Sequence, residues 1–174
     1  MMEEVRLTLD DLEKTREVIL KLGAVGAGNY KFVDKILVID EKKIDTELIT
    51  VRIMIENNRG TSDISSIIIT NESKISKDFK SQEEAIEYVK NIGYRQILTI
   101  TRDGTEYVLN KTRLFLENIY GLGPSLEIEG SYEDIVELQR KIPFKQILKI
   151  SVPEACYVLQ KSMEDVLFPT PFDS

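Results

Sequence analysis

The sequence predicts an α+β fold: an antiparallel β-barrel, or tunnel, of about eight strands, with helices packed outside it. Two observations lead to this fold class. Segments in which every second residue is apolar alternate with shorter segments that carry helix caps, and tight turns join neighbouring strands. About eight antiparallel strands joined in this way would curl rather than stay flat. No low-complexity linker interrupts the 174 residues, so we expect a single domain spanning residues 1–174.

The first half of the chain is expected to contain four strands and one helix. A strand near residues 5–9 leads to a helix that Asp10 and Asp11 begin and Gly23 ends. Strands are then expected near residues 31–39, 48–55 and 65–70, on the evidence of their alternating or β-branched residues.

The second half is expected to begin with a helix, because Ser81 and Glu84 form a capping box. Asp103-Gly104 predicts a two-residue hairpin turn between strands at 99–102 and 105–109. Further strands are expected near 112–118, 125–129 and 146–152. One helix should follow Ser131, and a last helix should begin at Pro153 and bury an apolar side that includes Cys156.

Composition and charge narrow the function classes. A net charge of −7 argues against nonspecific binding to nucleic acid. The absence of histidine removes the commonest general base and most zinc sites. The single cysteine excludes an intrachain disulfide, and no apolar run is long enough for a membrane span. We therefore expect a cytoplasmic protein with no membrane partner, whose chemistry uses carboxylates, Lys, Arg, Tyr or a hard metal ion.

Charged residues follow one face of several strands. In the segment 125–129, Leu126 and Ile128 point one way while Glu127 and Glu129 point the other, and the first strand repeats this register. Strict alternation puts the following charged residues on one shared face: Glu4, Arg6, Arg52, Arg113, Glu117, Glu127, Glu129 and Lys149. The opposite face is apolar, so helices should cover it and the charged face should line the interior.

Charges inside a barrel need partners, because an unpaired buried charge costs several kcal/mol. Arginine and lysine suit phosphate oxygens, whereas glutamates suit a hard cation. The pattern therefore predicts a site for a polyphosphate with a metal ion. Glu4, Glu127 and Glu129 are the candidate metal ligands.

Several segments carry a resemblance to a known family. They are Leu116-Glu117-Asn118-Ile119-Tyr120-Gly121-Leu122-Gly123 followed by Leu126-Glu127-Ile128-Glu129, together with Phe32-Val33-Asp34 and Val51-Arg52-Ile53-Met54. Over most of its length the chain is similar to the CYTH domain, the superfamily of triphosphate tunnel metalloenzymes that includes class IV adenylyl cyclases and thiamine triphosphatases.

The resemblance implies a tunnel that binds a nucleotide or other organic triphosphate together with Mg²⁺ or Mn²⁺. The basic residues that would bind phosphate are Arg6, Arg52, Arg102, Arg113 and Lys149. Glu117 stands where the family has an aspartate, and Glu117 and Arg52 are the candidate catalytic residues. An active protein would be a triphosphatase or an adenylyl cyclase, and the residue types do not separate the two. Assembly into a homodimer is left open.

The chain departs from the family pattern at positions that would carry chemistry. Met2, Met54 and Thr70 stand where the family has a glutamate, an arginine and a lysine. Alternatives therefore stay open: Arg6 and Arg52 are either ligand-binding groups or structural partners of carboxylates in an inert barrel. The whole domain is then either an enzyme or a catalytically degenerate module that binds an anionic ligand or a protein.

Overall fold

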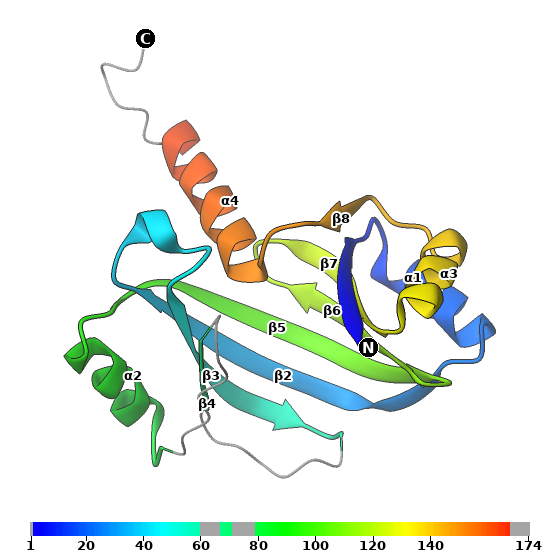
Figure 1. The fold of residues 1–174 in the computed structure, drawn as a ribbon, viewed down its shortest axis with the longest axis horizontal. Coiled ribbons are helices and arrows are strands. Elements are labelled where there is room, and N and C mark those ends of the chain that lie inside the picture. The colour runs from blue at the N-terminus through cyan, green and yellow to red at the C-terminus, as the bar shows by residue number, and fades with distance from the viewer. Residues whose placement is uncertain (1, 60–66, 71–78, 168–174) are drawn as a thin grey trace.

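The computed structural model describes residues 2–59, 67–70 and 79–167, and Figure 1 shows the arrangement of its elements. The elements in chain order are β1 (Glu3–Thr8), α1 (Leu12–Lys21), β2 (Val25–Val38), η1 (Glu41–Lys43), β3 (Leu48–Asn57), β4 (Ile67–Thr70), α2 (Gln82–Asn91), β5 (Arg95–Leu109), β6 (Thr112–Ile119), β7 (Gly123–Gly130), α3 (Tyr132–Lys141), β8 (Gln146–Leu148) and α4 (Val152–Leu167). None of the helices in these described ranges is long and apolar enough to cross a membrane.

The strands form one antiparallel sheet in the order β4-β3-β2-β5-β6-β7-β1-β8. The expected α+β class and antiparallel pairing are confirmed. Closure into a barrel is wrong for the described residues, because β4 and β8 lie at opposite edges and no ladder joins them. β4 and β8 are also the shortest strands described, so little backbone is available at either edge for a closing ladder.

Helices α1, α2 and α3 cover the outer face of the sheet, as the sequence predicts. Ile19 of α1 and Ile135 of α3 pack against strand residues such as Leu126 in a buried apolar cluster. Ala85 and Val89 of α2 pack on β2 and β3 in a second cluster. The two groups of helices lie at opposite ends of the sheet (Figure 1).

Helix α4 does not lie outside the sheet, which corrects the expectation that every helix would. Val152 and Cys156 pack against Ile36, Ile100 and Ile119. Each of these isoleucines lies two positions from a charged residue of the inner face, Asp34, Arg102 or Glu117, and therefore shares that face. The inner face is therefore charged over one half only, and α4 covers its apolar half. The expected apolar side of α4 is buried at Ala155 and Cys156, whereas Val158, Leu159 and Met163 are exposed.

The helix caps follow the sequence closely. Asp11, Ser81 and Ser131 each accept hydrogen bonds from backbone N–H groups in the first turn of the helix that follows. Ser151 does the same for α4, because its hydroxyl accepts from the N–H of Glu154. The strand expected over 146–152 is therefore shorter in the structure: β8 ends at Leu148, and Ser151 belongs to the cap of α4.

The predicted hairpin at Asp103-Gly104 is wrong. β5 runs without a break from Arg95 to Leu109, and the turn to β6 instead contains Asn110, whose φ of 55° is left-handed. Gly104 allows the Tyr30 ring to approach the backbone of β5 closely, since a Cβ built at Gly104 would lie 2.4 Å from Cζ of Tyr30. The Tyr30 ring thus packs directly on the backbone of β5.

The substitution Gly104→Ala is expected to destabilise the fold by about 1–3 kcal/mol, the usual cost of overpacking a filled interior. The Tyr30 ring cannot yield freely, because it stacks on Phe32 with ring centroids 5.6 Å apart. Urea unfolding measures the effect. Gly26→Ala in the neighbouring strand is the matched control, since its Cβ would meet nothing closer than 3.9 Å. Equal stabilities of the two variants would show that Tyr30 is not held in place.

Candidate functional site

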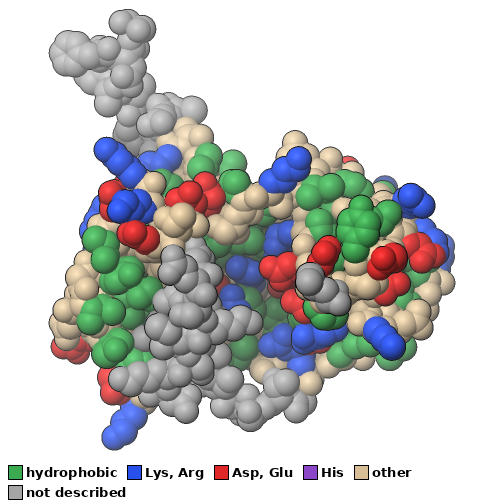
Figure 2. Space-filling view, viewed as in Figure 1, with side chains coloured by type: hydrophobic (Ala, Val, Ile, Leu, Met, Phe, Trp, Pro, Cys, Tyr) green, Lys and Arg blue, Asp and Glu red, His purple; other side chains and the backbone are tan. Residues whose placement is uncertain are grey.

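The charged half of the inner face forms a cavity of about 780 Å³. Its lining includes every candidate site residue identified from the sequence: Glu4, Arg6, Arg52, Arg102, Arg113, Glu117, Glu127, Glu129 and Lys149. Figure 2 shows Lys, Arg, Asp and Glu side chains gathered around the hollow in the middle of this face. The strand register explains the gathering, because Glu4 pairs with Glu129, and Arg6 with Glu127, across β1 and β7.

Three carboxylates stand together at the rim of the cavity. Glu4, Glu127 and Glu129 each offer an oxygen, and these oxygens lie within 4.8 Å of one another. Burial raises the pKa of Glu127 well above its usual range; Arg6 opposes the rise, and Glu4 and Glu117 add to it. A cation would relieve this crowding, and an all-oxygen donor set suits Mg²⁺ or Mn²⁺. The residues therefore fit the expected metal ion.

Arg6 holds the centre of the cavity. One of its terminal nitrogens donates to Glu117 at 2.9 Å and to Ser125 at 2.8 Å, and the other donates to Glu127 at 2.7 Å. Arg6 therefore already neutralises one candidate metal ligand, Glu127, and the candidate catalytic residue Glu117. All three hydrogen bonds cross between strands, so Arg6 also connects β1 to β6 and β7.

Glu117 is almost fully buried and has several cationic or hydrogen-bonding partners. Tyr30 donates to it at 2.5 Å, and Arg102 lies 3.6 Å away in addition to Arg6. Burial alone would raise the pKa of Glu117, but Arg6, Arg102 and the two hydrogen bonds outweigh that effect and hold it below its ordinary value. Glu117 is therefore a buried anion that orders the groups around it.

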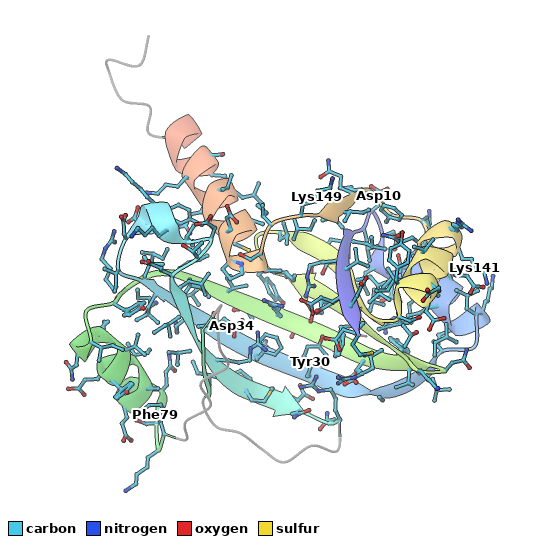
Figure 3. All side chains as sticks on the ribbon, in the orientation of Figure 1. Asp10, Tyr30, Asp34, Phe79, Lys141 and Lys149 are labelled. Atoms are coloured by element: carbon cyan, nitrogen blue, oxygen red, sulfur yellow. The ribbon has the colours of Figure 1, made fainter. Side chains whose placement is uncertain are left out.

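Asp34 lies deeper and bridges Arg52 and Arg102, the second of which also contacts Glu117. It accepts two hydrogen bonds from Arg52, at 2.8 and 3.0 Å, and lies 3.7 Å from Arg102. Figure 3 shows Asp34 and Tyr30 along β2, in the middle of the sheet. Among the described residues, the buried Nε of Arg102 has no hydrogen-bond partner, and burial lowers the pKa of the Arg102 guanidinium. A buried cation with an unused donor in a cavity is what an anionic ligand would satisfy.

Two charged residues that the sequence analysis did not identify complete the site. Glu106 accepts from Arg113 at 2.8 Å, and Arg59 lies 3.6 Å from its other oxygen. Glu106 was missed because the hairpin predicted at Gly104 broke the alternation. On one continuous strand, Arg102, Gly104 and Glu106 share a face.

Aromatic rings form the floor beneath several arginines. Tyr30, Phe32 and Phe115 pack as one cluster, and Met54 lies against it. Arg52 stands 3.9 Å above the Phe32 ring and Arg59 stands 4.3 Å above the Tyr30 ring. Such cation–π contacts fix the planes of the guanidinium groups. Met54, at the position where the resemblance implies a second arginine, is an apolar residue that packs against this floor.

Lys149 differs from the arginines. It lies in the irregular segment between β8 and α4, at the edge of the cavity, and is exposed (Figure 3). Among the described residues it forms no ion pair or hydrogen bond. Met2 lies beside Glu4 and Glu129 at the rim. The side chain of Thr70 lies outside the described part of the structure.

Comparison with known proteins identifies relatives by fold. No family model matches the chain, and no curated protein matches it in sequence. The PH1819 protein of Pyrococcus horikoshii is similar with a TM-score of 0.68 and 15% identity, covering 92% of this chain and 99% of its own. A proposed adenylate cyclase of Vibrio parahaemolyticus has a TM-score of 0.55 and 13% identity, covering 80% of each chain.

A third similar structure is a proposed adenylyl cyclase of Hippeastrum described as having a dominant triphosphatase activity. Its TM-score is 0.52 at 12% identity, with 90% of this chain and 94% of that chain covered. At these identities the similarity establishes the fold. Fold neighbours thus include proteins named as cyclases or triphosphatases, in agreement with the resemblance read from the sequence.

The substitution Glu117→Gln is expected to destabilise the protein by about 3 kcal/mol at neutral pH, because it removes a buried carboxylate from two ion pairs, with Arg6 and with Arg102, and leaves each arginine with one carboxylate partner fewer. Since the folded-state pKa of Glu117 is depressed, its contribution is complete above the unfolded-state pKa and disappears as the pH falls through the folded-state value. The difference between wild type and variant should therefore be constant near pH 7 and narrow below about pH 4.

Denaturant unfolding at both pH values measures this difference. Glu137→Gln is the matched control, since it removes a carboxylate from an exposed pair with Lys141 and should change stability by less than about 1 kcal/mol. A Glu117→Gln variant as stable as the control would mean that the buried pairs contribute nothing to folding.

Proposed function

We propose that the chain is a divergent CYTH-type protein that binds a nucleotide or other organic triphosphate together with a divalent metal ion in the cavity. The observation that carries this proposal is the adjacency of two opposite charge groups. Three carboxylates with oxygens within 4.8 Å of one another stand at the rim of a cavity whose lining also includes five arginines, Arg6, Arg52, Arg59, Arg102 and Arg113. Such a division suits a ligand that is itself a cation bound to a polyanion.

Phosphate oxygens would be bound by Arg6, Arg52, Arg102, Arg113 and Lys149, as the sequence predicts, and also by Arg59. Arg102 supports this role most directly, because its buried Nε has no hydrogen-bond partner in the part of the chain that the structure describes. Arg52 has a fixed plane between Asp34 and the Phe32 ring, so its remaining N–H groups have defined directions. Preorganised donors of this kind can stabilise charge that develops on a phosphoryl group.

Glu4, Glu127 and Glu129 would hold Mg²⁺ or Mn²⁺. A bound ion would supply Lewis-acid polarisation of the phosphate and orient a nucleophile. The chain's own part is to position the ligand: Arg6 and Arg52 neutralise phosphate oxygens, and Glu117 keeps Arg6 and Arg102 in place. Of the two candidate catalytic residues, Arg52 would contact the ligand directly, whereas Glu117 would act through Arg6 and Arg102, which it keeps in place. Hydrolysis and cyclisation would use the same groups and differ in the orientation of the substrate.

A second candidate function is a catalytically degenerate module that binds an anionic ligand or a protein. Two observations favour it. Met54 occupies the place of a cation in the aromatic floor, and Met2 takes the place of a carboxylate at the rim. In either case we propose the cytoplasm as the compartment, because the one cysteine is buried and unpaired.

Tripolyphosphate is expected to bind more tightly in the presence of Mg²⁺ or Mn²⁺, and Glu129→Ala should remove that enhancement. The reason is that Glu129 is one of only three carboxylates that the described residues offer to the ion. Calorimetric titration with and without metal measures both affinities. Glu133→Ala, which removes an exposed carboxylate from α3, is the control. Equal affinities with and without metal would eliminate the metal site.

Turnover of ATP, GTP, thiamine triphosphate and tripolyphosphate is expected to be well below about 1 s⁻¹, the lower end of common enzyme rates. The reason is that the loss of one preorganised contact costs about 10²–10³ in rate, and Met2, Met54 and Thr70 replace three expected groups. Release of phosphate and formation of cyclic nucleotide, each with Mg²⁺ or Mn²⁺, are the readouts.

The triple variant Met2→Glu, Met54→Arg, Thr70→Lys tests the cause of that low rate. Restored turnover would support a degenerate tunnel, whereas wild-type turnover near 1 s⁻¹ or faster would show an ordinary working enzyme. Failure of both binding and rescue would favour a module that binds a protein.

A further inference from the structure

At the rim of the cavity, Arg113 and a divalent ion would compete for the carboxylate of Glu129. Arg113 lies directly opposite Glu129 in the β6–β7 ladder, where facing side chains are in easy reach of each other. Its Nη1 approaches a Glu129 oxygen at 3.4 Å. An arginine that paired fully with Glu129 would occupy the lone pairs that a divalent ion needs.

In the observed structure, Glu106 pairs more closely with Arg113 than Glu129 does. Both Nε and Nη2 of Arg113 lie 2.8 Å from one Glu106 oxygen, so most of the fork points toward β5 and only Nη1 turns toward Glu129. The hydrogen bond to Glu106 is also the largest reason that the pKa of Arg113 is raised, ahead of the charge of Glu129.

Glu106 is itself held in place. Its side chain is only 9% exposed, and Arg59 lies 3.6 Å from its second oxygen. Arg59 is anchored in turn, because its Nε donates to Asn57 at 2.9 Å and its guanidinium stands over the Tyr30 ring. Arg113, by contrast, is 48% exposed; if Glu106 were lost, its contacts would be the Phe115 ring, 5.0 Å away, and Glu129. The immobile member of the pair is therefore the carboxylate.

We infer that Glu106 is a positioning residue for the candidate metal site: it draws Arg113 toward β5 and so keeps Glu129 available to a divalent ion. This inference rests on the proposed function, because it assumes that Glu4, Glu127 and Glu129 bind the ion. Glu106 belongs neither to the carboxylate cluster nor to the residues that line the cavity, and its connection to Glu129 runs through Arg113.

The test is calorimetric titration of Mn²⁺ alone into the wild type and three variants. Glu106→Gln should weaken Mn²⁺ binding by about tenfold, a usual effect for residues that support metal ligands. Arg113→Gln should bind Mn²⁺ at least as tightly as the wild type. The double variant should recover the affinity of Arg113→Gln, since the competing cation is gone.

Rescue by the second substitution distinguishes positioning from a structural role. A double variant that binds as weakly as Glu106→Gln would overturn the inference, as would a Glu106→Gln protein with wild-type affinity. Asp103→Asn is the matched control, because it removes a carboxylate from the exposed face of the same strand, where Lys31 and not Arg113 is its partner. It should leave Mn²⁺ binding unchanged.

Two further outcomes separate this inference from the proposed function. Mn²⁺ binding that Glu129→Ala abolishes and Glu106→Gln leaves intact would overturn only the role of Glu106. Absence of Mn²⁺ binding by the wild type would overturn the metal site and the role of Glu106 together. If Glu106→Gln fails to fold, Arg113→Gln alone still decides, because weaker Mn²⁺ binding by this variant would contradict the competition.

Discussion

The structure depends on the pairing of buried charges across the inner face of one sheet. Three buried carboxylates each lie between two cationic side chains: Asp34 between Arg52 and Arg102, Glu117 between Arg6 and Arg102, and Glu106 between Arg59 and Arg113. A cavity that gathers arginines without such partners would cost several kcal/mol for each charge. The carboxylates make the charged half of the sheet tolerable, and the same contacts fix where each guanidinium points.

Much of the fold could be predicted from alternation and capping, because both are local. Asp11, Ser81 and Ser131 begin helices as their side chains dictate, and the outer face is apolar where α1, α2 and α3 cover it. The errors have tertiary causes. The pair Asp103-Gly104 is typical of a turn, yet Gly104 lies within β5 and makes room for the Tyr30 ring of β2. Helix α4 packs on the inner face because that face changes from charged to apolar along β2, β5 and β6, a change that only the register reveals.

Seven of the nine candidate residues could be predicted because strand register decides which side chains share a face. Arg102 came from the family resemblance, and Lys149, expected on a strand, lies beyond the end of β8. All nine line the one cavity, although their roles in binding or catalysis stay predictions. Their pairing could not be read from the sequence. Arginine side chains reach across neighbouring strands, so Arg6 contacts Glu117 on β6 as well as Glu127 on β7. Glu106 was missed because the predicted hairpin divided β5, and Tyr30 was missed because the strand expected from residue 31 in fact begins at Val25.

The pairing also determines how ligands would bind. In the free protein, Glu127 is neutralised by Arg6, and Glu129 is approached by Arg113. A cation arriving alone would have to break these contacts, and would leave Arg6 with Glu117 and Arg113 with Glu106 as their remaining carboxylate partners. A polyanion arriving alone would instead draw both arginines away from Glu127 and Glu129. Arriving together, the cation takes the carboxylates and the polyanion takes the arginines, so every charge keeps a partner. Since each ligand removes the cost of binding the other, their affinities must be reciprocally linked. If the proposed function holds, a cavity whose charges are already paired would favour the metal–polyphosphate complex over either component.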